Sequence, residues 1–276
     1  GRALTRVARA AGGTAAAGHA SWMLLNDTLG HFQTSNTPGF TGESYYDRVL
    51  AAGYKNPVLV TDEFVFITGQ SNTAGMGVQI VSALLAAPYH TRGMLRGFHD
   101  IGVSILSSKD VSVHAPRIAG QFNLAYNTSV DLQRAAPGSV RTYPCDGTGG
   151  THTQLTNEIP SPIPNRNLAL NPVGHPIYVI GVVSQTLRIN SAVVQERQTG
   201  NPIELRAPLT ADNDPQHGLR MNEVFLIPDS PLKTNSTYLV KVTGTNGARP
   251  FDRAFTFSTG AVTDAYAFAA DPTRRN

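Results

Sequence analysis

The stretch Gly30-His31-Phe32-Gln33, continued by Gly39-Phe40-Thr41-Gly42, places a histidine in a glycine-rich loop. Small and apolar residues recur at helical spacing directly before it and predict a helix over 14–26 that ends in the turn before Gly30. Site residues concentrate in loops that a rigid scaffold positions, so His31 is a candidate site residue. His19 lies in the predicted helix, where it either contributes to the same cleft or is a core histidine hydrogen-bonded to a neighbour.

The rest of the N-terminal part predicts helices packed on a small antiparallel sheet, an α+β arrangement. Glu63 lies in an apolar, β-branched stretch that predicts a strand, and an unpaired buried charge there would be costly. Pro88 ends a helical pattern, and His90 follows it. We expect helices at 43–52 and 71–87, and strands at 58–67, 101–106 and 121–127.

These residues resemble the bacterial branch of the CAP superfamily, which comprises the cysteine-rich secretory, antigen 5 and pathogenesis-related-1 proteins. The resemblance implies an α-β-α sandwich over 1–130 and a secreted or cell-envelope location. The chain departs from the family at Asp62-Glu63-Phe64, where the family motif is Gly-Glu-Asn, and it lacks a second glutamate in the helix before His90. The matching residues, in the family's order, are His31, Gly53-Tyr54, Glu63, Pro88-Tyr89-His90-Thr91-Arg92 and Ile101-Gly102-Val103.

Two histidines and a glutamate favour two kinds of site. His31, His90 and Glu63 could bind zinc or another divalent metal, because Zn²⁺ accepts imidazole nitrogen and carboxylate oxygen. The same side chains, with His19, could instead recognise a small-molecule, lipid or peptide ligand by hydrogen bonding. A buried network that only bridges loops to the sheet is a third interpretation. A secreted metal-dependent hydrolase using this cleft is an alternative function.

The C-terminal part predicts an all-β sandwich. A proline-rich segment, 131–175, is expected to connect it to the first domain, and a tail follows at 263–276. Strand patterns recur over 176–262, with turn signals at Gly200-Asn201 and Asn246-Gly247, and resemble a bacterial immunoglobulin-like domain. A structural or adhesive surface protein acting through this domain is therefore a further alternative. The expected strands are 177–183, 187–195, 203–209, 223–227, 237–243 and 251–258.

Composition narrows the function classes. Only 15% of residues are charged, the net charge is +3, and no basic run is interleaved with aromatic residues, so we expect no nucleic-acid partner. No apolar stretch is long enough for a spanning helix. The single cysteine, Cys145, forms no intrachain disulfide and is expected to be an inert exposed thiol or to pair between chains. His152, His175 and His217 lie in predicted loops and are expected to face solvent.

Overall fold

The structure is a computed structural model that describes residues 6–69, 76–112, 117–127, 136 and 138–261. The chain divides into two compact units. Unit 1 comprises 1–79, 93–133 and 268–276, and unit 2 comprises 80–92 and 134–267. In the described part of the chain, no helix combines the length and apolarity needed to cross a bilayer.

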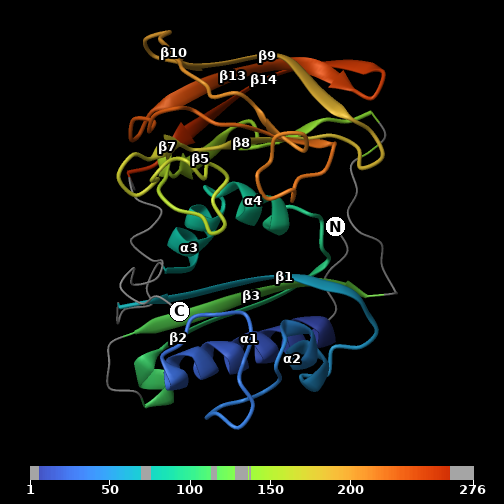
Figure 1. The fold of residues 1–276 in the computed structure, drawn as a ribbon, viewed down its shortest axis with the longest axis vertical. Helices are drawn as coiled ribbons and strands as arrows, with labels where there is room; N and C mark the ends of the chain where they lie inside the picture. The colour runs from blue at the N-terminus through green and yellow to red at the C-terminus, as the bar shows by residue number, and fades with distance from the viewer. Residues whose placement is uncertain (1–5, 70–75, 113–116, 128–135, 137, 262–276) are drawn as a thin grey trace. The chain divides into compact units, whose positions relative to one another are not determined.

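Unit 1 is built on a three-stranded antiparallel sheet of order β1-β3-β2. Its strands are β1 (Pro57–Thr68), β2 (Asp100–Ser107) and β3 (Ile118–Asn127), close to the ranges that the sequence predicts. Figure 1 shows α1 (Arg6–Asn26) and α2 (Tyr45–Ala51) on one face of this sheet. A short 3-10 helix, η1 (Ser108–Val111), follows β2.

The helix α1 lies close against the sheet because small residues face each other where they meet. Ala11 and Ala15 of α1 pack with Ala125 of β3. Further along the helix, Ala20 and Met23 join a cluster with Ala119, also of β3. A Cβ atom on Gly102 of β2 would lie 2.1 Å from the carbonyl carbon of Gly12, so only glycine fits there.

The predicted α-β-α sandwich is wrong. Strands carry far more residues than helices over the described part of the chain. The helical residues expected to complete the N-terminal domain are also divided between the units. The helices are α3 (Met76–Leu84) and α4 (Pro88–Met94). Most of each helix lies within residues 80–92, which belong to unit 2, and the remaining residues belong to unit 1. The helix expected to end before Pro88 does end there, at Leu84, and Pro88 also begins a new helix, because proline is well tolerated in a first helical turn.

The described part of unit 2 contains a β-sandwich of two sheets and a separate two-stranded sheet, β6-β7. One sheet of the sandwich has the order β11-β12-β8-β4 and the other β10-β9-β13-β14-β5. Val179 and Val224 of the first sheet share one buried cluster with Val194, Val240 and Phe257 of the second. The sandwich predicted for the C-terminal part is therefore present. Its longer strands are β8 (Ile177–Ile180), β9 (Leu187–Glu196), β12 (Glu223–Leu226), β13 (Thr237–Asn246) and β14 (Arg249–Thr259).

The segment expected to be a connector contributes strands to both sheets. Within 131–175, β4 (Arg141–Tyr143) pairs with β8, and β5 (Thr148–Thr151) pairs in parallel with β14. These strands were missed because each is only three or four residues long, too short to show a strand pattern within a segment rich in proline and glycine. The remaining short strands are β6 (Gln154–Leu155), β7 (Val173–Gly174), β10 (Pro202–Ile203) and β11 (Leu209–Thr210).

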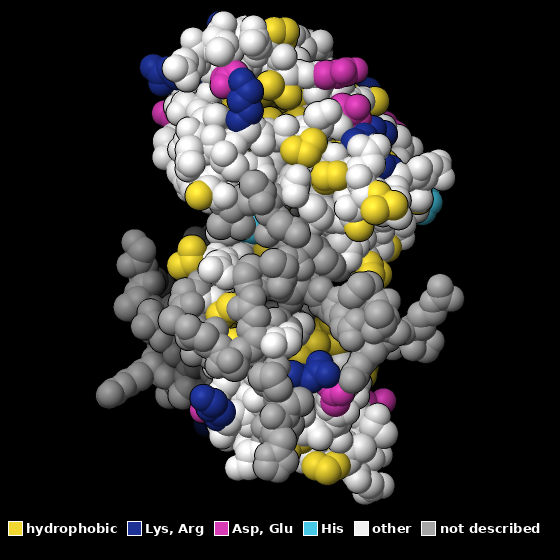
Figure 2. Space-filling model, turned by 90° about the vertical axis from the view of Figure 1, so that its left-hand side faces the viewer, with side chains coloured by type: hydrophobic (Ala, Val, Ile, Leu, Met, Phe, Trp, Pro, Cys, Tyr) yellow, Lys and Arg dark blue, Asp and Glu magenta, His cyan; other side chains and the backbone are white. Residues whose placement is uncertain are grey.

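On the face drawn in Figure 2, apolar side chains of unit 2, in the upper part of the view, are scattered among polar atoms. Acidic and basic side chains lie between them, mostly towards the margins. A mixed surface of this kind is ordinary for a folded protein. On this face, the described residues of unit 2 therefore form no broad patch of one kind.

Candidate functional site

His19 holds the loop that carries His31. The His19 side chain is fully buried on α1, and its ring stacks on Trp22 with centroids 5.6 Å apart. Its Nε2 donates to the carbonyl oxygen of Gly30 at 2.7 Å, and its Nδ1 accepts from Gln33 Nε2 at 3.0 Å. These partners are satisfied together by the neutral tautomer with its proton on Nε2. The His19 ring therefore fastens the loop from inside unit 1.

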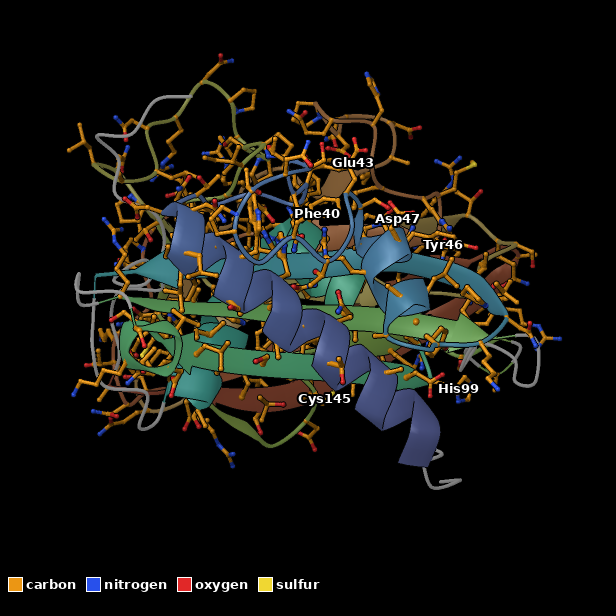
Figure 3. All side chains as sticks on the ribbon, turned by 90° about the horizontal axis from the view of Figure 1, so that it is seen from below. Phe40, Glu43, Tyr46, Asp47, His99 and Cys145 are labelled. Carbon is orange, nitrogen blue, oxygen red and sulfur yellow. The ribbon has the colours of Figure 1, made fainter. Side chains whose placement is uncertain are left out.

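His31 is exposed on that loop. Its carbonyl oxygen accepts from Arg48 of α2 at 3.0 Å, and the buried Arg48 guanidinium also donates to the carbonyl oxygens of Gly42 and Glu43. Figure 3 shows Phe40 on the loop and Glu43, Tyr46 and Asp47 around the start of α2. The backbone of the loop is thus well fixed, and the His31 side chain is displayed outward.

The predicted trio of His31, Glu63 and His90 is not brought together within either unit. Glu63 lies in β1 opposite Asn123 of β3, but its side chain is outside the described part of the structure. His31 belongs to unit 1 and His90 to unit 2. Among the described residues, no three His, Cys, Asp or Glu side chains form a group that could hold a metal ion. The zinc site remains a prediction.

His90 has an acidic partner in unit 2 that the sequence did not indicate. One oxygen of Glu158, Oε1, lies 2.9 Å from His90 Nδ1. The same oxygen accepts from the backbone N–H groups of Tyr89 at 2.8 Å and His90 at 3.0 Å. First-turn N–H groups have no acceptor inside their own helix, so Glu158 serves as a cap for α4 from a distant segment. The His90 side chain is 33% exposed, whereas that of Glu158 is fully buried.

Burial and hydrogen bonding act against each other at Glu158. Burial raises the pKa of this carboxyl group, while His90 and the two backbone N–H groups act to lower it. Burial is the larger effect, so the net shift is upward. The contact with Glu158 fixes the orientation of the His90 ring, as in the histidine–carboxylate pairs that orient a catalytic or ligand-binding imidazole.

Two more acids hold α4. Asp214 accepts from the hydroxyl of Tyr89 and from the backbone N–H groups of Gly218 at 2.6 Å and Leu219 at 2.8 Å. Burial disfavours its charge, but the Tyr89 hydroxyl and the backbone donors together keep the pKa of Asp214 below its usual value. Burial and Asp214 in turn raise the pKa of Tyr89. Tyr89 is thus held by both acids, and the next residue of the helix, His90, is held by Glu158.

Glu223 is the third acidic residue that holds α4, after Glu158 and Asp214. Its Oε2 accepts from Arg92 Nε at 2.7 Å, and its Oε1 accepts from the Tyr178 hydroxyl at 2.9 Å. The carboxylate is buried on β12, where an unpaired charge would be costly. The only sequence signal for any anchor was here, because a carboxylate at the head of the apolar run Val224-Phe225-Leu226 needs a partner.

The other histidines give a mixed outcome. His217 is exposed, as predicted, but the prediction is wrong for His152 and His175, which are buried. The ring of His175 packs between Tyr143 and Phe257 at centroid distances of 6.0 and 6.4 Å. Loop position favoured exposure, but both side chains are buried in the folded unit. Cys145 is exposed, and its Sγ lies 3.2 Å from the carbonyl oxygen of Thr142.

No protein-family model and no curated protein matches the chain. The resemblances to CAP and immunoglobulin-like proteins thus remain predictions, and the anchored histidine of unit 2 is the feature that bears on function.

Proposed function

We propose that the chain is a binding protein that recognises a small polar ligand through His90. The observation that carries this proposal is the 2.9 Å contact between His90 Nδ1 and the buried Glu158. A binding site gains affinity when its polar groups are already oriented, because little side-chain entropy is then lost on association. His90 meets this condition while a third of its side chain reaches solvent.

The chemistry of the pair defines what the ligand must offer. With Nδ1 directed at Glu158, the neutral ring carries its lone pair on Nε2 and can accept from a ligand donor. The ligand is therefore a polar molecule that donates a hydrogen bond to the imidazole.

A library of small polar metabolites, screened by ligand-observed NMR, tests the proposal. Hits should lose binding in His90→Ala, and should weaken in Glu158→Gln because the ring loses its charged partner. His217→Asn is the matched control: it removes an exposed histidine of the same unit, and asparagine tolerates the positive φ of 51° at that position. Hits that bind His90→Ala as tightly as the parent protein would contradict the proposal, as would a library without any hit.

Hydrolysis is a second candidate, favoured by the same contact. A carboxylate that orients histidine is the arrangement of a general base and its partner. Cleavage of p-nitrophenyl acetate by the whole chain should then fall at least tenfold in His90→Ala and remain unchanged in His217→Asn. An equal rate in all three proteins would exclude a catalytic role for His90 toward this ester.

A further inference from the structure

Unit 2 contains a second concave site, which the His90 proposal does not use. It is an open pocket of about 330 Å³. Its apolar floor is formed by Ile163, Leu209 and Ile227, all of which are largely buried. The volume lies at the lower end of the range for small-molecule sites, roughly 300–1,000 Å³. The pocket therefore suits a ligand with a compact apolar body.

Two loops form the walls, and internal hydrogen bonds or ring constraints hold both of them. On one side, Asn213 Oδ1 accepts from the backbone N–H of Thr210 at 2.7 Å, and Asn213 Nδ2 donates to the carbonyl oxygen of Pro208 at 3.0 Å. On the other side, Pro162 and Pro164 restrict the backbone. A pocket with fixed walls binds without a large ordering cost.

Charge at the rim has one sign. Of the described residues that line the pocket, Arg206 is the only charged one. Arg206 Nη1 lies 2.6 Å from Asp229 Oδ1, and Arg166 Nη1 approaches the same oxygen at 2.8 Å. These two arginines hold the pKa of Asp229 below its usual value. Two guanidinium groups share one carboxylate, so Asp229 does not neutralise Arg206 one to one.

We infer that this pocket binds a small organic monocarboxylate whose apolar body occupies the floor and whose carboxylate pairs with Arg206. The guanidinium of arginine has several donors in one plane and matches the two oxygens of a carboxylate. Asp229 fixes Arg206 from one side, which orients the remaining donors without neutralising the whole cluster. An apolar floor and a single lining cation fit a monocarboxylate better than a phosphate, which usually takes more donors.

Titration calorimetry of the full chain with 4-phenylbutyrate, and with its neutral amide, tests this inference. The carboxylate should bind about tenfold more tightly than the amide, because a charge-assisted hydrogen bond is lost in the amide. Arg206→Gln should remove this preference. Ala207→Trp should abolish binding of both compounds, because an indole at the lining position of Ala207 fills the pocket.

Two control variants show whether binding depends on this pocket. Arg197→Gln removes an exposed arginine elsewhere in unit 2 and should bind 4-phenylbutyrate like the parent protein. His90→Ala should also bind it normally, so failure of the His90 proposal leaves this one standing. Equal affinity for acid and amide, or unchanged binding in both Arg206→Gln and Ala207→Trp, would overturn the inference. Circular dichroism of each variant verifies that the sandwich is folded.

Discussion

Gly102 and Gly13 differ in the space that is available for a side chain. A side chain on Gly102 would collide with the backbone of Gly12, whereas a Cβ on Gly13 of α1 meets no atom of the described residues within 4 Å. Gly102→Ala should therefore destabilise unit 1 by about 1–3 kcal/mol through overpacking. Gly13→Ala should stabilise it by about 0.5–1 kcal/mol, because glycine is unfavourable inside a helix.

Urea unfolding followed by Trp22 fluorescence measures both changes, since Trp22 is the only tryptophan and lies buried in unit 1. The two variants differ from the parent by the same methyl group. If both variants shift the midpoint in the same direction, the close approach of α1 to β2 is not the reason that position 102 requires glycine.

His175 should make unit 2 sensitive to acid. Burial, and secondarily the charge of His152, lowers the pKa of His175 to about 3 from an ordinary value near 6.5. The unfolded chain therefore takes up the proton first, so stability is complete above pH 6.5 and falls as the pH drops towards 3. The slope contributed by this one group is at most about 1.4 kcal/mol per pH unit.

His175→Phe keeps an aromatic ring against Tyr143 and Phe257 but cannot titrate. Urea midpoints at pH 7 and pH 4.5, followed by far-ultraviolet circular dichroism, should therefore differ less in this variant than in the parent protein. His217→Asn should retain the parental difference, because His217 is exposed. An unaltered pH dependence in His175→Phe would show that another group is responsible.

At the scale of elements, α4 is held by side chains rather than by its own length. The helix has only seven residues, too few for stability in isolation. In Glu158→Ala, the N–H groups of Tyr89 and His90 lose their acceptor, and hydrogen exchange at these amides should accelerate about tenfold or more. Glu204→Ala, which removes an exposed acid of the same unit, should leave the exchange unchanged. Unchanged exchange in Glu158→Ala would assign the stability of α4 to packing.

Prediction from sequence succeeded for elements whose signals are local. The strands β9, β12, β13 and β14 follow from β-branched runs and from the turns at Gly200 and Asn246, all of which are encoded by adjacent residues. The partners of His90 could not be predicted in this way. Glu158 lies 68 residues from His90, in a proline-rich stretch without periodicity, and only the folded sandwich brings them together. Burial of His175 escaped prediction for the same reason.

For the molecule as a whole, the sandwich begins earlier than the sequence predicts: it was expected over 176–262, but β4 and β5 also belong to it. The strands β4 and β5 cover the edges of β8 and β14. A fragment of 176–261 would expose both edges, and exposed strand edges pair with other chains. Both this fragment and the longer fragment 138–261 lack residues 80–92 of unit 2, so they differ in the edge strands and not in α4. We expect 176–261 to be the less soluble of the two, as measured by the protein left in solution after centrifugation. Equal solubility of the two fragments would show that these edge strands are dispensable.

The anchoring of α4 also sets an order of events during synthesis. The ribosome completes α4 before it makes any of the three acids that hold it. Measured along the chain, Glu158 follows Tyr89 by 69 residues, Asp214 follows it by 125, and Glu223 follows Arg92 by 131. Until the last of these segments has left the exit tunnel, the helix has only part of its partners, and a nascent chain stalled before residue 158 has none of these acids. The histidine that we assign to binding thus becomes oriented only late in translation.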